Sequence, residues 1–243
     1  MKGIILAGGS GTRLDPLTRV TNKHLLPVYD EPMIFHPIKT LAAAGIHEIQ
    51  MVIGGNGVGN IVKICGSGSE FGISLSYTHQ DEPGGIAQAL GYTEAFAKGN
   101  PIVVILGDNI FEDSIKEYVE IFQGNSDSCH IFLTESDQPE RFGVAEVDKD
   151  GSVLGIVEKP KKPKSNTIVT GLYFYPSDIY DAIEWVKENI GYSWRNELEI
   201  TDVNNYYIKR KRCVAHLLKG FWSDAGTFPT LLRAANFVAS KKT

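Results

Sequence analysis

The sequence predicts an α/β fold with a Rossmann-like mixed, mostly parallel sheet flanked by helices. A short apolar run from Gly3 to Leu6 indicates a buried strand that stops at paired glycines. A second run, from Pro101 to Leu106, is rich in β-branched residues and is typical of a central parallel strand buried on both faces. Because no linker, internal repeat or low-complexity tract interrupts the 243 residues, we expect a single domain over residues 1–243.

The composition is that of an ordinary soluble globular protein, with 42% hydrophobic and 22% charged residues. A net charge of −5 disfavours a nucleic-acid binder, which would more often be basic. The sequence has no apolar run long enough for a membrane span, and its N-terminal run is too short for a signal peptide. Cys65, Cys129 and Cys213 are odd in number and form no C-x-x-C pair, which indicates free thiols in a reducing compartment. We therefore expect a cytoplasmic protein without membrane or nucleic-acid partners.

The other strands follow from local hydrophobic patterns. Apolar or alternating runs predict strands at 48–53, 73–78, 131–134, 141–147, 153–158 and 169–175. The strands at 141–147 and 153–158 are expected to form a hairpin with its turn at Lys149-Asp150-Gly151. Tyr173 and Tyr175 share one face of the last strand, which indicates packing rather than chemistry.

The helices are placed by their start and stop signals. They are expected at 32–44, from residue 86, at 177–187 and after residue 227. Pro32 suits the first position of a helix, and Gly45 suits its C-terminal stop. Either Thr201 or Asp202 is expected to cap a further helix.

The segment Leu6–Arg13 indicates a phosphate-binding loop after the first strand. Its three glycines remove side chains, so that backbone N–H groups can approach phosphate oxygens. Arg13 adds a fixed fork of donors, and Lys23 adds a mobile point charge. Neither the dinucleotide fingerprint nor the P-loop pattern fits the spacing. A nucleotide-phosphate site of another kind is favoured, with a purely structural glycine turn as the alternative.

A second glycine-rich stretch, Gly54–Gly59, resembles a phosphate loop but has no cation before Lys63. We interpret it as a strand-to-helix turn. Further along, Gln80 precedes the turn Pro83-Gly84-Gly85. Its side-chain amide, opposite the backbone of Gly85, can read the acceptor–donor–acceptor edge of thymine or uracil.

Asp108 directly follows a predicted buried strand, at the sheet edge where open α/β folds bind ligands. Asp224 likewise follows an apolar stretch, and both aspartates are expected to precede helical segments. Two carboxylates beside a phosphate loop suit Mg²⁺, whereas no Cys/His cluster suggests zinc. A helix cap or turn is the alternative for each aspartate.

The segments Gly3–Arg13 and Asn22–Val28 resemble the sugar-1-phosphate nucleotidylyltransferases, in particular the glucose-1-phosphate thymidylyltransferases. Glu158-Lys159-Pro160 and Trp222–Thr227 match later motifs of that family in the same order. The resemblance implies the nucleotide-diphospho-sugar transferase fold. It also implies Mg²⁺-dependent conversion of dTTP and α-D-glucose 1-phosphate into dTDP-glucose and pyrophosphate, the first step of dTDP-rhamnose and deoxysugar synthesis.

The resemblance also implies a role for each matching residue. The catalytic residues would be Arg13, Lys23, Asp108 and Lys159, and the metal ligands Asp108 and Asp224. The nucleotide would contact Leu6, Gly8, Gly9, Gly11, Thr12, Gln80, Pro83 and Gly85, and the sugar phosphate would contact Gly143, Glu158, Lys159 and Val169. Two departures stand out, because many members carry Gln at His24 and Tyr at Phe142.

Several alternatives stay open. Thymine and uracil share the edge that Gln80 would read, so UTP is an alternative substrate to dTTP. The main alternative function is that of a uridylyl- or cytidylyltransferase acting on another sugar 1-phosphate. A non-catalytic nucleotide-sugar sensor would be expected to lose Arg13, Lys23 or an aspartate, and an NAD-type oxidoreductase is opposed by the failed fingerprint. The chain stops at Thr243, whereas longer relatives continue into helices that build a feedback site. We therefore expect weak or no inhibition by dTDP-rhamnose, and homo-oligomerisation through other surfaces stays open.

Overall fold

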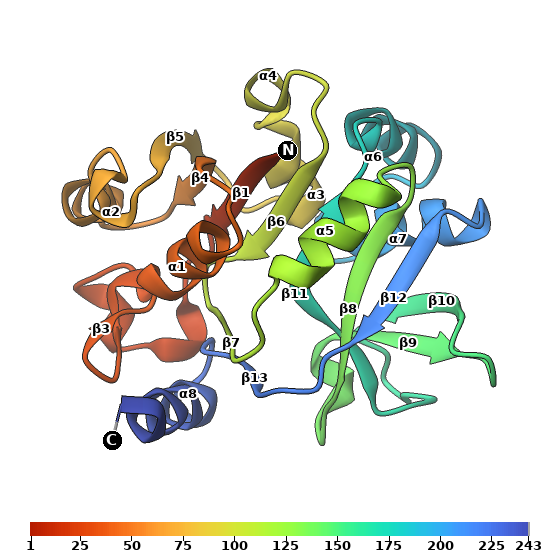
Figure 1. The fold of residues 1–243 in the computed structure, drawn as a ribbon. Coiled ribbons are helices and arrows are strands. Elements are labelled where there is room, and N and C mark those ends of the chain that lie inside the picture. Colours follow the sequence, from red (N-terminus) through yellow and green to blue (C-terminus); the bar gives the residue numbers. More distant parts are fainter. Residues whose placement is uncertain (243) are drawn as a thin grey trace. The chain divides into compact units, whose positions relative to one another are not determined.

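The computed structural model describes residues 1–242, and the chain divides into two compact units. The glycine-loop unit contains residues 2–83, 105–117 and 220–242, and the hairpin unit contains residues 84–104 and 118–219. Strand β6 (Ile102–Leu106) and helix α5 (Lys116–Gly124) carry the chain from one unit to the other. Figure 1 labels most of the elements of both units. Thr243, the end of the predicted domain, lies outside the described residues.

The glycine-loop unit is built on three parallel strands that the sequence predicted. Its strands are β1 (Lys2–Ala7), β2 (Pro27–Val28), β3 (Glu31–Pro32), β4 (Glu48–Gly54), β5 (Ser74–Gln80), β7 (Asn109–Phe111) and β13 (Trp222–Asp224). β4 pairs with β1 on one side and with β5 on the other, so the C-terminal ends of all three point the same way. Ligand-binding loops are commonly found at such ends.

Helices and a small apolar core complete this unit. The helices are α1 (Phe35–Ala43), α2 (Val58–Cys65) and α8 (Phe228–Lys242). α8 packs against β2 and β13, and its Ala234 and Val238 join a buried cluster with Leu14 and Val28. Leu14 lies directly after the predicted phosphate loop, so burial of this side chain anchors the end of the loop.

The hairpin unit contains a mixed sheet. Its strands are β8 (Cys129–Glu135), β9 (Gly143–Val147), β10 (Val153–Glu158), β11 (Thr167–Tyr175) and β12 (Cys213–Leu217). The predicted hairpin is present as β9 and β10, with the turn residue Gly151 at φ +83°. β11 pairs antiparallel with β8 and β9, and β12 pairs parallel with β8.

Four helices belong wholly to this unit, namely α3 (Ile86–Gly91), α4 (Glu94–Ala97), α6 (Ile179–Asn189) and α7 (Ile200–Lys209). α7 packs against β10 and α6 packs against α7. Tyr173 and Tyr175 are both buried on β11 and stack with ring centroids 5.9 Å apart. Their predicted packing role is confirmed.

Three local predictions were wrong. The first helix begins at Phe35 instead of Pro32, because Glu31 and Pro32 pair with Val28 and Pro27 as a short hairpin. Asp108 precedes strand β7 and not a helix. Glu199, rather than Thr201 or Asp202, occupies the N-cap position of α7.

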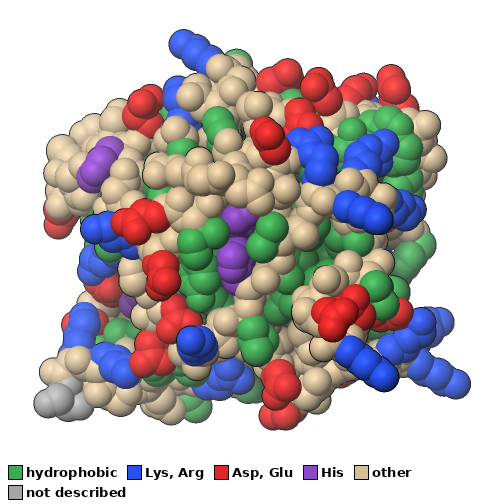
Figure 2. All heavy atoms as spheres, turned by 45° about the vertical axis from the view of Figure 1, so that its right-hand side comes forward, with side chains coloured by type: hydrophobic (Ala, Val, Ile, Leu, Met, Phe, Trp, Pro, Cys, Tyr) green, Lys and Arg blue, Asp and Glu red, His purple; other side chains and the backbone are tan. Residues whose placement is uncertain are grey.

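The face of the molecule drawn in Figure 2 carries charged side chains of both signs. Figure 2 shows Lys/Arg and Asp/Glu side chains interspersed around an area of hydrophobic and histidine side chains. Cys65, Cys129 and Cys213 are free thiols, as predicted. Within residues 1–242, no helix is long and apolar enough to cross a membrane.

Candidate active site

The predicted phosphate loop folds over Lys23. Gly11 adopts φ +69°, and a Cβ atom at this position would lie only 2.8 Å from the Cβ of Lys23. Gly9 is also close, since a Cβ there would lie 3.2 Å from the Lys23 Nζ. These glycines allow the loop to approach the lysine, which a side chain would prevent. The structure therefore brings the predicted loop and the predicted cation together.

Lys23 forms a short ion pair with Asp108. The Nζ–Oδ2 distance is 2.6 Å, and each side chain is only 12% exposed. Burial alone would raise the pKa of Asp108, but the Lys23 ammonium and its hydrogen bond outweigh burial and lower it. Asn109 donates a further hydrogen bond of 2.9 Å to Asp108 Oδ1. Asp108 is consequently held as a carboxylate.

Asp108, Asp224 and Arg13 converge around Gly226. A Cβ atom at Gly226 would lie 3.1 Å from Asp224 Oδ2, 3.2 Å from Arg13 Nη2 and 3.5 Å from Asp108 Oδ2. The short antiparallel pair β7–β13 produces this convergence, because it places Asp224 opposite Asn109. The backbone N–H of Ala225 also donates to the Asp108 carbonyl oxygen at 2.7 Å. Two residues 116 positions apart in the sequence thus lie beside one arginine.

This donor set fits a hard divalent cation that shares phosphate oxygens. Mg²⁺ is usually held by one or two carboxylates together with substrate phosphates and water. Among residues 1–242, no group of three or more His, Cys, Asp or Glu side chains could hold a metal. Asp108 and Asp224 are the carboxylates at this site that could hold such a cation.

The other predicted nucleotide residues of this unit lie around the same strand ends. Leu6 is buried near the end of β1, and its carbonyl accepts the N–H of Gly107 at 2.9 Å. Gln80 is the last residue of β5, is only 6% exposed, and places its side-chain oxygen against Gly8. Thr12 and Pro83 are exposed on the surface.

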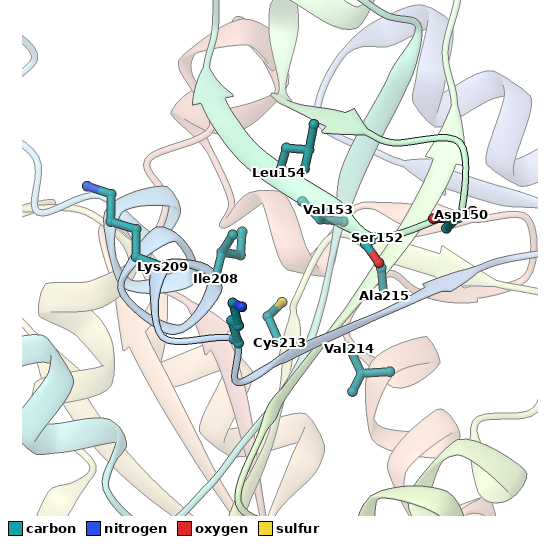
Figure 3. A pocket seen from close by; sticks show the side chains of 11 residues that line it. Asp150, Ser152, Val153, Leu154, Ile208, Lys209, Cys213, Val214 and Ala215 are labelled. Carbon is teal, nitrogen blue, oxygen red and sulfur yellow. The ribbon is translucent and has the colours of Figure 1, made fainter.

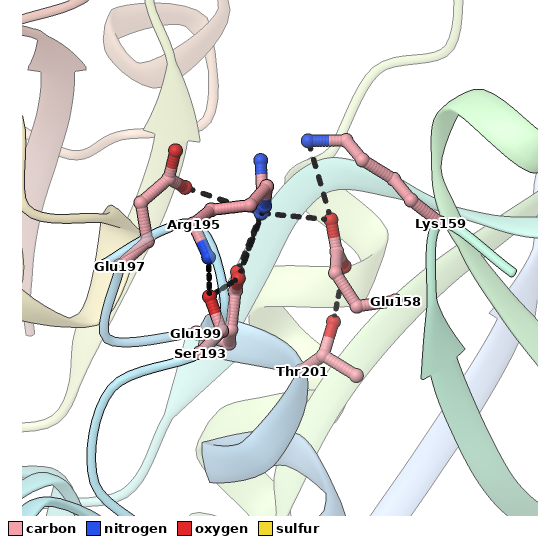
Figure 4. A network of polar contacts seen from close by, with 7 residues as sticks. All are labelled: Glu158, Lys159, Ser193, Arg195, Glu197, Glu199 and Thr201. Carbon is pink, nitrogen blue, oxygen red and sulfur yellow. Dashed lines mark hydrogen bonds and ion pairs between the residues drawn. The ribbon is translucent and has the colours of Figure 1, made fainter.

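A second polar cluster lies in the hairpin unit, at the end of β10. Glu158 accepts a hydrogen bond of 2.6 Å from the Thr201 hydroxyl and lies 3.5 Å from the Lys159 ammonium. Lys159 is exposed, takes a left-handed φ of +43°, and donates its backbone N–H to the Phe142 carbonyl. The departure at Phe142 leaves this backbone contact in place. Figure 4 shows Glu158 between Lys159, Thr201 and Arg195.

Arg195 belongs to the same polar cluster, and the sequence did not single it out. Its guanidinium lies 2.8 Å from Glu199, 3.1 Å from Glu197 and 3.4 Å from Glu158 (Figure 4). Burial alone would lower its pKa, but the hydrogen bond to Glu199 and the nearby carboxylates raise it. Burial raises the pKa of Glu197, although the positive charge of Arg195 acts in the opposite direction. The arginine lies in the loop between α6 and α7, where no sequence motif marks it.

The remaining predicted residues of the hairpin unit differ in how close they lie to Glu158. Gly143 is adjacent, since a Cβ atom there would lie 3.4 Å from Glu158 Oε2. Val169 is buried on β11 and pairs with Leu133. Gly85 has φ +100° and lies against the backbone of Leu198. Contact of Val169 and Gly85 with a ligand stays a prediction.

A cavity of about 620 Å³ lies elsewhere in the hairpin unit. Figure 3 shows it between the β9–β10 turn, the end of α7 and strand β12. No residue predicted for the active site lines it. The cavity is therefore separate from the Glu158 cluster.

Several known proteins are similar to this chain over nearly its whole length. A glucose-1-phosphate thymidylyltransferase of Neisseria meningitidis is 43% identical over 241 residues, which covers 98% of this chain and 82% of the relative. A solved Bacillus anthracis chain, provisionally named glucose-1-phosphate thymidylyltransferase and bound to sucrose, superposes with a TM-score of 0.91 at 48% identity, covering 98% of this chain and 94% of that one. UDP-glucose pyrophosphorylase in complex with UDP-glucose superposes with a TM-score of 0.84 at 25% identity, covering 99% and 98%.

The predicted fold class, a mixed and mostly parallel sheet flanked by helices, is confirmed by these neighbours. The family model described as nucleotidyl transferase matches residues 2–241, which is nearly the whole chain. The chain therefore belongs to the nucleotidyl transferase family.

Proposed function

We propose that this protein transfers a thymidylyl group from dTTP to α-D-glucose 1-phosphate, giving dTDP-glucose and pyrophosphate. The observation that carries the proposal is the convergence of Arg13, Asp108 and Asp224 around Gly226. Lys23 forms an ion pair with Asp108 at the same place. The thymidylyltransferase relatives, which align with nearly the full chain, supply the choice of substrates. Both units together would form the single nucleotidylyltransferase domain that the sequence predicts.

The glycine-loop unit would bind the nucleotide. Backbone N–H groups of the loop at Gly8–Gly11 suit the triphosphate oxygens, and Arg13 adds a bidentate donor for the β- and γ-phosphates. Gln80 is buried at the end of β5, where its amide can hydrogen-bond to the edge of a pyrimidine. Lys23, held beside Asp108, would contact the α-phosphate.

Asp108 and Asp224 would hold Mg²⁺ together with the triphosphate. When bound, the cation would neutralise charge on the phosphates and on the leaving pyrophosphate. The carboxylates suit this role because Asp108 is kept ionised by Lys23. Without a cation, two neighbouring carboxylates would repel the triphosphate.

The hairpin unit would bind the sugar phosphate. Glu158 suits sugar hydroxyl groups, because a carboxylate accepts hydrogen bonds on both oxygens. Lys159 is exposed, and both Lys159 and Arg195 contact the same oxygen of Glu158, Oε1, so two cations lie close together for the phosphate. Arg195 would exchange part of its contact with the carboxylates for the bidentate geometry that phosphate offers.

The sugar phosphate itself would be the nucleophile. With a second pKa near ~6, it is mostly dianionic at pH 7, so no general base is required. One of its oxygens forms a bond to the α-phosphorus of dTTP while the bond from that phosphorus to the β-phosphate oxygen breaks. The electron pair leaves with pyrophosphate. Catalysis would rest on alignment for in-line attack and on neutralisation of developing charge.

UTP is the second candidate donor. Thymine and uracil present the same hydrogen-bonding edge, and the UDP-glucose pyrophosphorylase structure shares the fold at 25% identity. We place the reaction in the reducing cytoplasm, where the free thiols of Cys65, Cys129 and Cys213 would persist.

A substrate panel tests the proposal. Five nucleoside triphosphates are each combined with several sugar 1-phosphates and Mg²⁺, and pyrophosphate release is measured. The highest kcat/KM is expected for dTTP with glucose 1-phosphate. A preference for UTP would assign the runner-up activity, and binding of nucleotide sugars without any pyrophosphate release would indicate a sensor.

A further inference from the structure

Lys23 is held by its two neighbours in the sequence. The three residues 22–24 open a single 3₁₀ turn, in which Asn22 is the N-cap of Lys23–Leu25. Asn22 and His24 are 4% and 1% exposed, so both side chains point into the protein while Lys23 contacts Asp108. Buried polar side chains next to a site residue must satisfy their hydrogen bonds internally, which fixes their geometry.

The hydrogen bonds of Asn22 determine its orientation. Its amide nitrogen donates to the carbonyl oxygens of Gly54 and Asn56, at 3.1 and 2.9 Å. Carbonyl oxygens only accept, so the amide nitrogen must face them and the side-chain oxygen must face the other way. That oxygen accepts the backbone N–H of His24 at 3.1 Å and meets the His24 Nδ1 at 2.8 Å.

The tautomer of His24 follows from this arrangement. Because the Asn22 oxygen can only accept, the proton of a neutral imidazole must lie on Nδ1. Burial, assisted by the Lys23 charge, lowers the pKa of His24 to about 3, so the ring is neutral at physiological pH. A neutral ring adds no positive charge that would repel the Lys23 ammonium.

The ring of His24 also contacts the segment that carries Asp108. A Cβ atom at Gly107 would lie 2.8 Å from the His24 Cδ2, so the ring lies directly on this glycine. The backbone N–H of Gly107 also donates a hydrogen bond of 2.9 Å to the Leu6 carbonyl oxygen. The imidazole therefore lies between the residue that orients it, Asn22, and the backbone that immediately precedes Asp108.

We propose that Asn22 and His24 are positioning residues that hold Lys23 against Asp108, and that the glycine-rich stretch Gly54–Gly59 anchors them. This stretch is then a structural support whose backbone carbonyls hold Asn22, and not a second phosphate site. The proposal rests on the proposed function, because it assigns these residues to the alignment of the nucleotide half of that reaction.

The first test is structural and independent of activity. A crystal structure of His24→Leu is expected to show the Lys23 Nζ no longer within hydrogen-bond distance of Asp108. His24→Gln, which keeps an amide donor, is expected to retain the pair. If Lys23 and Asp108 stay paired in His24→Leu, the proposal is wrong, whatever the protein catalyses.

The second test is kinetic. Asn22→Ala and His24→Leu are each expected to lower kcat by about 10–100-fold, the loss typical of a misplaced reacting group, while KM for glucose 1-phosphate stays unchanged. His24→Gln should restore most of the activity. His47→Leu is the matched control, because His47 is an exposed histidine of the same unit. Asn22→Asp, which is nearly isosteric, replaces Asn22→Ala if the alanine variant does not fold.

A double-mutant cycle separates positioning from general stability. If His24 acts through Lys23, the His24→Leu change should cost little further activity in a Lys23→Ala background. Fully additive losses, or normal kcat in folded His24→Leu protein, would overturn the proposal. An inactive wild type would instead refute the proposed function and leave the crystallographic test decisive.

Discussion

Arg13 is exposed at the end of the glycine loop, so replacing it tests chemistry with little effect on packing. We expect Arg13→Ala to lower kcat by about 10²–10³-fold, because triphosphate charge would be left uncompensated in the transition state. Circular dichroism should be unchanged. Arg19→Ala is the matched control, since Arg19 is exposed and pairs with Asp15. Near-normal turnover of Arg13→Ala would show that the loop has another role.

Lys159 allows the two substrates to be tested separately. Lys159→Ala should weaken glucose 1-phosphate binding by about tenfold or more, the loss of one charge-assisted contact, and leave dTTP binding nearly unchanged. Isothermal titration calorimetry of each ligand measures both effects. Lys161→Ala, an exposed lysine two positions on, should match the wild type. Equal losses for both ligands would contradict the assignment.

At the scale of residues, the sequence indicated which side chains lie together in the glycine-loop unit better than it did in the hairpin unit. Asp108 and Asp224 were paired because each follows an apolar stretch, and the structure brings both to Gly226. Arg195 was missed because it comes from a loop, whose path no periodic pattern reveals. The roles of all these residues toward substrate stay predictions.

At the scale of elements, the two histidines of β8 and β12 predict a pH-dependent stability. His130 is fully buried among Phe122 and Phe174, and its Nδ1 lies 3.0 Å from the His216 Nε2. Burial, with His216 nearby, lowers the pKa of His130 to about 4, and burial also lowers that of His216.

The direction of the effect follows from proton binding. Below the ordinary pKa of about 6.5, His130 binds a proton in the unfolded chain but stays neutral in the folded protein. The free energy of unfolding therefore falls as the pH drops from 6.5 towards 4. Thermal unfolding should show a smaller loss of Tm between pH 7 and 4.5 in His130→Phe than in the wild type. His47→Leu, an exposed histidine, should behave like the wild type. Parallel Tm profiles in all three proteins would exclude the buried pair as the cause.

Most strands were predictable, because continuous apolar runs such as β6 and alternating runs such as β5 are local signals. The errors occurred where a tertiary contact overrode a local one. Pro32 is a suitable first helical residue, yet it pairs with Pro27 in the hairpin β2–β3. Thr201 is a suitable cap, yet its hydroxyl donates to Glu158 on β10. Neither partner can be identified from the residues adjacent in the sequence.

At the scale of the whole molecule, the proposed reaction requires a divalent cation. EDTA should abolish turnover, and Mg²⁺ or Mn²⁺ should restore it, because Asp108 and Asp224 would otherwise repel the triphosphate. Asp108→Asn and Asp224→Asn should each be nearly inactive, with wild-type circular dichroism. Full activity in EDTA, or an unimpaired Asp224→Asn, would mean that these aspartates only stabilise the β7–β13 region.

The division into two units was not predictable from composition, since neither Pro83-Gly84 nor Glu117-Tyr118 looks like a linker. The single domain over residues 1–243 stays a prediction. The proposed reaction depends on one step, in which the phosphate of glucose 1-phosphate attacks the α-phosphorus of dTTP.

An isotope experiment tests that claim most directly. Glucose 1-phosphate labelled with ¹⁸O in its phosphate oxygens is incubated with dTTP, Mg²⁺ and the wild-type protein, and both products are analysed by mass spectrometry. Direct attack of the sugar phosphate on the α-phosphorus predicts that all label appears in dTDP-glucose and none in pyrophosphate. Label in pyrophosphate, or no labelled dTDP-glucose, would contradict it.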